Sequence, residues 1–183
     1  LAAQPLVRRS YSDPLLTFST NTLGTANVLQ AVRDVEQIRA AVIVTTDKVY
    51  ENFAVDYGYK EEDRLGGKDP YSASKACAEL VVSAYKSSYF SMPESAAIAS
   101  VRSGNVFGGG DWSEDRLVPD LVRAAINQEE VTIRNPESIR PWQHVLDPLY
   151  GNLTVGQGLL LGNRDYEGAW NFGPDDQTVL TVG

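Results

Sequence analysis

Two long segments of the chain carry apolar residues at the spacing of an amphipathic helix. In residues 13–34 the apolar positions are Leu16, Leu23, Val28, Leu29 and Val32. In residues 70–90 they are Ala76, Leu80, Val81 and Ala84. Asp13 stands before Pro14, and Pro70 opens the second segment, the position at which a helix tolerates proline. The pattern therefore predicts two helices.

Between and after these helices lie two short runs rich in branched apolar residues. They are "RAAVIVTT" (39–46) and "AAIASVRSG" (96–104), and a polar, Gly-containing segment (50–69) reads as a loop. Runs of this kind are typical of strands buried on both faces of a parallel sheet. The order helix, strand, helix, strand predicts βαβ units and an α/β fold with a doubly wound parallel sheet.

The sequence changes character after residue 104, and we expect a smaller, mixed α/β lobe over 105–183, following a sheet domain over 1–104. The segment 105–119 is rich in glycine and aromatic residues. Beyond it the pattern predicts a helix over 120–128, strands over 131–134 and 143–146, and a strand entering a turn over 169–174. The chain can return to the first sheet near its end.

Composition restricts the possible functions. The net charge of −8 and the pI near 4.6 argue against a general binder of nucleic acids or anionic membranes. One cysteine and one histidine cannot supply a usual zinc site, so no metal is expected, and a reducing cytoplasm is the simplest compartment. No apolar run is long enough for a membrane span. The chain opens without methionine and stops just after a predicted strand, so we expect an internal fragment.

Tyr71 and Lys75 lie four residues apart on the second predicted helix and so share one face. A phenol loses its proton only near a pKa of about 10, and a neighbouring ammonium lowers that pKa. The pair could then act as a base near neutral pH. The alternative is two solvated side chains on a surface helix.

Thr46, Asp47 and Lys48 stand where the first predicted strand ends. In open α/β sheets, ligands bind at the carboxyl ends of strands. A hydroxyl, an acid and an amine at that edge could shuttle protons. The alternative is a turn with solvated charges.

The second lobe combines cations with aromatic rings, which is typical of sites for phosphorylated ligands. The residues are Arg116, Arg134, Arg140, Trp112, Trp142 and His144. The alternatives are surface arginines that lie over apolar neighbours and a structural histidine.

Eight motifs in order resemble the extended short-chain dehydrogenase/reductase family, and within it the nucleotide-sugar 4,6-dehydratases. They are "LAAQPLVRRSY", "NTLGTANVLQA", "TTDKVY", "DPYSASKACAEL", "VRSGNVFGGGDW", "RLVPDLV", "RPWQHVLDPL" and "WNFGP". The motifs "TDK", "GGGDW" and "IRPWQHV" are most similar to members that act on CDP-glucose. The resemblance implies the C-terminal part of an NAD-binding Rossmann domain with part of a nucleotide-sugar lobe. It also implies a hydro-lyase that supplies deoxysugars, for example to O-antigen.

The resemblance implies a catalytic role for five residues. Tyr71 takes the C4 hydroxyl proton while hydride passes to NAD, and Lys75 holds the nicotinamide ribose and lowers the Tyr71 pKa. Thr46 binds the C4 oxygen, and Asp47 protonates the departing C6 hydroxyl. Lys48 stands where many members have glutamate. It can remove the C5 proton only as a neutral amine. Otherwise it steadies the enolate while water or Asp47 moves the proton.

The resemblance also implies binding residues and a homodimer built on 13–34 and 70–90. The further cofactor contacts are Leu1, Ala2, Ala3, Asn21, Arg102 and Ser103. The sugar nucleotide contacts are Gln4, Asn105, Arg116, Leu117, Arg134, Arg140 and His144, with Arg140 on the diphosphate. The family's Gly-x-x-Gly-x-x-Gly loop and ribose-binding acid are absent from this chain. We therefore expect the piece alone to be inactive and assign the function to its parent protein.

Three alternatives stay open at this point. A nucleotide-sugar 4-epimerase of the same fold would use the same tyrosine and lysine but needs no acid and amine at 47–48. A dehydratase for dTDP- or GDP-sugars would differ only in the nucleotide. A non-catalytic domain that keeps the fold has no need of Tyr71, Lys75 or Asp47, and all three are present.

Overall fold

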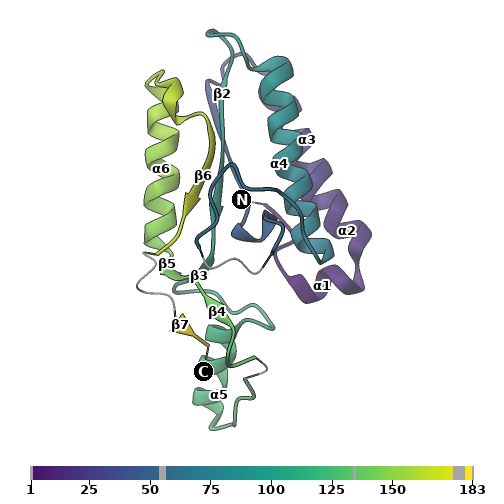
Figure 1. Ribbon diagram of the computed structural model, residues 1–183, viewed down its shortest axis with the longest axis vertical. Coiled ribbons are helices and arrows are strands. Elements are labelled where there is room, and N and C mark those ends of the chain that lie inside the picture. Colours follow the sequence, from purple (N-terminus) through teal and green to yellow (C-terminus); the bar gives the residue numbers. More distant parts are fainter. Residues whose placement is uncertain (1, 54–56, 134, 175–179, 183) are drawn as a thin grey trace.

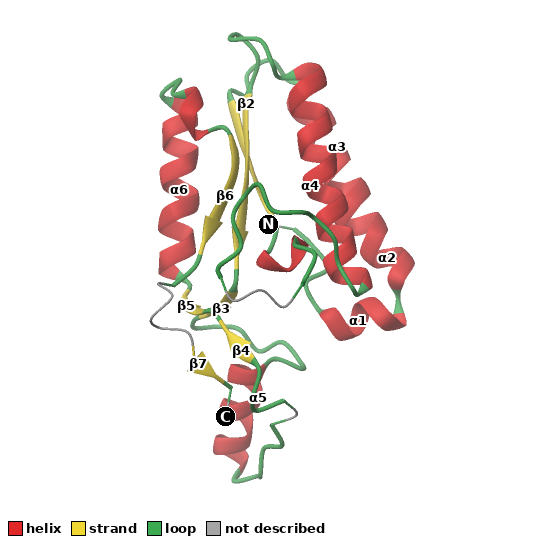
Figure 2. Ribbon diagram, in the orientation of Figure 1, coloured by secondary structure: helices red, strands yellow, loops and turns green. Residues whose placement is uncertain are grey.

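A three-stranded parallel sheet forms the centre of the computed structural model, which describes residues 2–53, 57–133, 135–174 and 180–182. The strands lie in the order β1-β2-β6, and helices cover both faces (Figures 1 and 2). Their bounds are β1 Ala40–Val44, β2 Ala97–Ser103 and β6 Gly168–Phe172. Val101 of β2 pairs with Val44 on one side and Trp170 on the other. The expected α/β class with a parallel sheet is confirmed.

Both helices predicted from the apolar pattern are present on one face of the sheet. The first is a continuous helical stretch, which the structure divides into α2 (Pro14–Phe18), a π-helical turn η1 (Ser19–Leu23) and α3 (Gly24–Asp34). The second is α4 (Pro70–Tyr89), and a short helix α1 (Val7–Ser12) precedes them. The Asp13 carboxylate accepts a hydrogen bond from the Leu16 amide at 3.1 Å. The Asp69 carboxylate accepts one from the Ser72 amide at 3.0 Å, so both helices begin at side-chain caps.

The core on this face joins α3 and α4 to the sheet. Its buried members are Leu29, Val32, Val82, Phe90, Ala96 and Ile98. β2 is buried almost throughout, as its sequence predicts. β1 is also covered on both faces, as expected: Ala41 and Ile43 pack on this core and the other three residues of the strand pack on the core of the opposite face, but each of them is only partly buried. The reason is that, within the described chain, β1 pairs along one edge only, with β2.

The opposite face is covered by α6 (Leu146–Leu160), an element that the sequence analysis did not predict. Val155 and Leu159 of α6 pack on the alanines and valine of β2. Three glycines lie within α6, and glycine lowers helix propensity by about 1 kcal/mol relative to alanine. Gly158 is needed for packing, because a Cβ there would approach the Tyr166 ring to 2.4 Å. After the short turn η3 (Arg164–Tyr166), β6 returns the chain to the sheet.

A second lobe lies beyond the carboxyl ends of the strands (Figure 1). It contains α5 (Leu117–Asn127), a parallel pair of β3 (Asn105–Phe107) with β5 (Trp142–His144), and an antiparallel pair of β4 (Ile139–Arg140) with β7 (Leu180–Thr181). The strand predicted over 131–134 is wrong for residues 131–133, and residue 134 lies outside the described residues. The strand predicted over 143–146 ends at His144, because α6 begins at Leu146. In the described part of the chain, no helix combines the length and apolarity that a bilayer span requires.

Candidate active site

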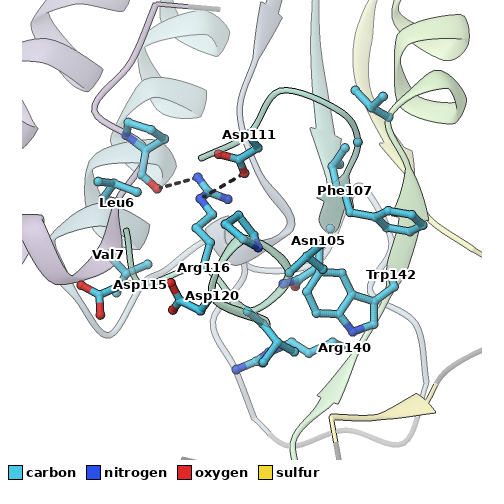
Figure 3. Close-up of a pocket in the computed structure, with 18 of the residues that line it drawn as sticks. Leu6, Val7, Asn105, Phe107, Asp111, Asp115, Arg116, Asp120, Arg140 and Trp142 are labelled. Carbon is cyan, nitrogen blue, oxygen red and sulfur yellow. Dashed lines mark hydrogen bonds and ion pairs between the residues drawn. The ribbon is translucent and has the colours of Figure 1, made fainter. Parts of the chain in front are cut away.

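A pocket of about 740 Å³ opens between the carboxyl edge of the sheet and the second lobe (Figure 3). This volume falls in the range of small-molecule sites. Part of its wall comes from residues that the sequence analysis singled out. The predicted site residues that line it are Thr46, Lys48, Tyr71, Ser103, Asn105, Arg116, Leu117 and Arg140.

Hydrogen bonds connect the side chains at the end of β1 in a row. Tyr71 on α4 is hydrogen-bonded to Thr46. The Thr46 hydroxyl donates to Asp47 Oδ1 at 3.1 Å, and Lys48 Nζ donates to the same oxygen at 3.2 Å. The chain turns here as a 3₁₀ turn, η2 (Asp47–Val49), in which the Thr46 side chain accepts a hydrogen bond from the Lys48 amide. The phenol and the carboxylate, which sequence alone could not place together, therefore belong to one hydrogen-bonded group.

Burial raises the pKa of the Tyr71 phenol above its ordinary value of 10.0. The Asp47 carboxylate acts in the same direction, whereas the hydrogen bond to Thr46 and the Arg116 cation oppose it. This direction is opposite to the one expected from a helix neighbour at Lys75. The physical reason is that Tyr71 is only 9% exposed, so water cannot stabilise a phenolate there.

Lys75 lies one turn further along α4 and is buried as well. Its Nζ donates to the carbonyl oxygen of Val44, the last residue of β1, at 3.1 Å. Burial lowers the Lys75 pKa, and the nearby Glu79 carboxylate acts against that change. The ammonium is therefore held at the carboxyl edge of the sheet, beside the strand end that carries Thr46.

The opposite wall of the pocket belongs to the second lobe. Arg116 reaches toward the main-chain carbonyl of Pro5 at 3.5 Å and the Asp111 carboxylate at 4.0 Å (Figure 3). Arg140 is half-buried and points into the same space from β4. Asn105 contributes an amide oxygen that is buried and without a hydrogen bond among the described residues. This wall offers cations and one unsatisfied acceptor to a polar ligand.

Gln4 and Asn21, expected at the substrate and the cofactor, have their polar atoms engaged in the protein. The Gln4 amide nitrogen donates to Thr17 Oγ1 at 2.9 Å and to the Leu6 carbonyl at 3.1 Å. Asn21, in the π-helical turn, accepts from the Gln4 main chain and donates to Ser74 Oγ at 2.9 Å. Both are buried and neither lines the pocket, so their side chains hold the segment before α1 against α4.

Other predicted contacts also lie away from the pocket. The Arg102 guanidinium is buried and paired with Glu79 at 2.8 Å, and Arg102 does not line the pocket. His144 accepts a hydrogen bond from the Leu146 amide at 3.3 Å, at the beginning of α6. Ala2 and Ala3 do not line the pocket, whereas Ser103 does. Leu1 and Arg134 lie outside the described residues.

Gly104 is a site residue that the sequence analysis missed. A Cβ there would lie 2.6 Å from Pro141 Cγ and 3.3 Å from Asp47 Oδ2. The missing side chain lets the strand end at Asp47 and the second lobe at Pro141 approach each other. A glycine directly after a strand is a weak signal, and only the packing shows its use.

The arrangement can hold a polar ligand and move a proton between oxygen atoms. Its chemistry is that of hydroxyl, carboxylate and ammonium groups. The described residues contain no group of three or more His, Cys, Asp or Glu side chains that could hold a metal ion.

Three comparisons with known proteins agree with this geometry. The family model described as GDP-mannose 4,6 dehydratase matches residues 1–157. CDP-glucose 4,6-dehydratase of Salmonella typhimurium is 50% identical over the whole chain, which covers 52% of that protein. dTDP-D-glucose 4,6-dehydratase of Dictyostelium discoideum is 28% identical over 96% of the chain and 40% of the relative.

Solved structures show the same fold. The dTDP-glucose 4,6-dehydratase DesIV of Streptomyces venezuelae, as a double mutant with NAD bound, superposes with a TM-score of 0.82 and 28% identity. The match covers all of this chain and 52% of that one. The chain thus spans about half the length of the Salmonella enzyme and of DesIV.

Proposed function

Because this chain belongs to the GDP-mannose 4,6 dehydratase family of extended short-chain dehydrogenases/reductases, we propose that its protein is an NAD-dependent nucleotide-sugar 4,6-dehydratase, a hydro-lyase. The observation that carries the proposal is the hydrogen-bonded row Tyr71, Thr46, Asp47 and Lys48. Three of its members, Tyr71, Thr46 and Lys48, line a pocket whose other wall presents Arg116 and Arg140. The hydrogen-bonded row can move protons on a hexose, and the two arginines suit the diphosphate of a sugar nucleotide.

The residues present fit an NAD nicotinamide ribose at the carboxyl edge of the sheet. An ammonium has three N–H donors, and among the described residues Lys75 Nζ makes one hydrogen bond, to the Val44 carbonyl. Two donors therefore remain for ribose hydroxyls. When bound, NAD supplies the acceptor for the hydrogen of C4 and its return to C6.

The chain's own residues supply the proton chemistry. Tyr71 accepts the proton of the C4 hydroxyl, with Thr46 as a hydrogen-bond partner of the same oxygen. A ketone at C4 acidifies the C5 hydrogen, so the C6 hydroxyl can leave as water. Asp47 gives a proton to that hydroxyl. The raised pKa of Tyr71 requires that the phenolate be stabilised within the assembled site, and the Thr46 hydrogen bond and the Arg116 cation are the groups that act in that direction.

Lys48 takes the role of a cation beside the reacting carbons. Its ammonium is paired with Asp47, and both side chains are about one-third exposed. A paired ammonium steadies the enolate formed at C5, while water or Asp47 moves the proton. If Lys48 is instead the C5 base, Lys48→Ala abolishes exchange of the C5 hydrogen with solvent. Persistence of that exchange supports the cation role.

CDP-glucose is the substrate that we propose, giving CDP-4-dehydro-6-deoxy-glucose. Support comes from the 50% identity to the Salmonella enzyme of that name and from the motifs "GGGDW" and "RPWQHV". We also propose a cytoplasmic homodimer. Its interface would use exposed apolar residues of α3 and α4 and of the turn between α2 and α3, with Leu23, Val28 and Leu80 each at least half exposed. The product would feed deoxysugar synthesis for O-antigen or lipopolysaccharide.

The complete gene product that contains this sequence, supplied with NAD, tests the proposal. CDP-glucose is compared with dTDP-glucose and a GDP-sugar, and 4-keto product is read from its ultraviolet absorbance in base. A 4-keto-6-deoxy product from CDP-glucose is expected. An epimerised hexose without loss of water would support the 4-epimerase instead, for which Asp47 and Lys48 have no evident use.

A further inference from the structure

Glu79 is a buried carboxylate that the proposed mechanism does not use. It lies on α4 one turn beyond Lys75 and is 4% exposed. Three groups donate to it: the Thr45 hydroxyl, the Ser100 hydroxyl at 2.7 Å and the Arg102 guanidinium at 2.8 Å. Both carboxylate oxygens of Glu79 therefore accept hydrogen bonds inside the protein.

Three consecutive residues at the end of β1 meet three residues of α4 that are spaced four apart. Val44 accepts from Lys75 through its carbonyl, Thr45 donates to Glu79 through its hydroxyl, and Thr46 is hydrogen-bonded to Tyr71. Residues four apart lie on one helix face. The contact at Glu79 therefore fixes the register in which Tyr71 and Lys75 meet the strand end.

Glu79 also faces Lys75 electrostatically. Burial lowers the Lys75 pKa, and the Glu79 carboxylate counteracts this and favours the charged ammonium. On its far side Glu79 pairs with Arg102, whose second nitrogen donates to the Tyr50 hydroxyl at 2.7 Å and to the Glu61 carbonyl at 3.1 Å. The Glu79 charge is thus compensated on one side and acts on Lys75 on the other.

We propose that Glu79 is a positioning residue for the Tyr71–Lys75 pair, holding α4 in register with the end of β1 through its contacts with Thr45, Ser100 and Arg102. The same carboxylate favours the charged form of Lys75. The inference rests on the proposed function for its kinetic consequences. Its structural claim, the register of α4 against the end of β1, rests on the contacts of Glu79 alone.

The alternative is that the ion pair between Glu79 and Arg102 only stabilises the fold. The chain offers a matched control in Glu167, whose side chain is 11% exposed. Glu167 pairs with Lys86, on the same helix α4, at 3.3 Å and with Arg164 at 2.5 Å. Glu167 lines no part of the pocket. Removing the Glu167 charge should destabilise the fold, as removing the Glu79 charge does, but it should not affect Lys75.

The test compares Glu79→Gln, Glu79→Asp and Glu167→Gln in the complete gene product with NAD and CDP-glucose. For Glu79→Gln we expect kcat at neutral pH to fall about tenfold, with KM nearly constant and the pH profile of kcat displaced upward by about one unit. Glu79→Asp keeps the charge and returns the profile toward that of the wild type. Glu167→Gln lowers the melting temperature and leaves the pH profile in place.

An NMR titration of the Lys75 13Cε signal separates this inference from the proposed function. In Glu79→Gln the signal titrates at lower pH than in the wild type, whether or not CDP-glucose is turned over. An unchanged Lys75 titration overturns the inference, as does a pH profile identical to that of Glu167→Gln. If the wild-type protein shows the expected Lys75 titration but does not turn over CDP-glucose, the proposed function is overturned and the inference about Glu79 is not.

If Glu79→Gln does not fold, Thr45→Val tests the register directly, since it removes one donor and keeps the Glu79 charge. We expect kcat to fall several-fold with the Lys75 titration unchanged. A Thr45→Val enzyme with wild-type kcat overturns the positioning role.

Discussion

The two walls of the pocket are built in different ways. At the end of β1, Thr46 and Tyr71 line the pocket and are each less than one-tenth exposed, and Lys75, which does not line it, is equally buried. Lys48 and its partner Asp47 are about one-third exposed. The wall of the second lobe is open, with Trp112 57% exposed and Arg116 and Arg140 held by long contacts. The two groups that we propose to act on the C4 oxygen are thus fixed by packing, whereas the arginines that we propose to bind the ligand reach out on long side chains. Changes on the first wall should therefore act on kcat and changes on the second on KM.

Tyr71→Phe should give the largest effect, because it removes the proton acceptor and keeps the buried ring. General acid–base groups contribute about 10²–10⁴-fold, so kcat with CDP-glucose should fall by that factor. Thermal unfolding should change little, since the ring still fills its place. A kcat within about threefold of the wild type would place the base elsewhere.

Arg140→Ala tests the open wall. A hydrogen bond to a charged group is worth about 1.5–3 kcal/mol, so KM should rise by about 10–150-fold with kcat nearly kept. The exposed Arg33, on α3 and away from the pocket, gives the control Arg33→Ala, which should leave both constants unchanged. An Arg140→Ala enzyme that loses kcat instead would erase the distinction between the walls.

Gly104→Ala acts where the two walls meet. The added Cβ must displace Pro141 or Asp47, and overpacking costs about 1–3 kcal/mol. Thermal denaturation should show a lower melting temperature. Gly173→Ala is the matched control, because a Cβ there meets nothing within 4 Å. Equal melting temperatures for the two variants would show that the walls do not depend on this contact.

The smallest effect concerns alkaline stability. Burial raises the pKa of Tyr71, so the folded state holds the phenol proton more tightly than the unfolded state does. The stability that this contributes is present below a pH of about 10 and is lost as the pH rises through the raised pKa. Above a pH of about 10, the free energy of unfolding should therefore fall less for Tyr71→Phe than for the wild type, and denaturant titrations at several pH values measure this difference. Parallel losses would mean that Tyr71 is not shielded from water.

The spacing of apolar residues along the chain was enough to predict the helices and the strand that position Tyr71, Lys75 and Thr46. The period of apolar residues predicted the helical stretches of α2, α3 and α4. Asp13, expected at the start of the first, is its observed cap, whereas the cap of α4, Asp69, was not predicted. Tyr71 and Lys75 could be paired because residues four apart share a helix face. The helix α6 was missed because its glycines, which serve packing, weaken the helical pattern.

Features of the site that depend on contacts between distant segments could not be predicted from the sequence. The hydrogen bonds from Gln4 to Thr17 and from Asn21 to Ser74 link residues far apart in the sequence, and the spacing along the chain does not reveal them. Burial decides the direction of the Tyr71 pKa, and no spacing reveals burial. Glu79 follows Lys75 by four residues, a visible signal, but its partners on β1 and β2 appear only in the fold.

The most direct test of the account follows one hydrogen atom through the reaction. The complete gene product, with NAD, is given CDP-glucose that carries deuterium at C4, and the product is analysed by NMR. The account predicts a 4-keto-6-deoxy sugar nucleotide with the deuterium at C6, because a single pocket holds C4, C5 and C6 of one hexose beside Tyr71 and Asp47. A product with the deuterium still at C4, or a hexose that keeps its C6 hydroxyl, would contradict it.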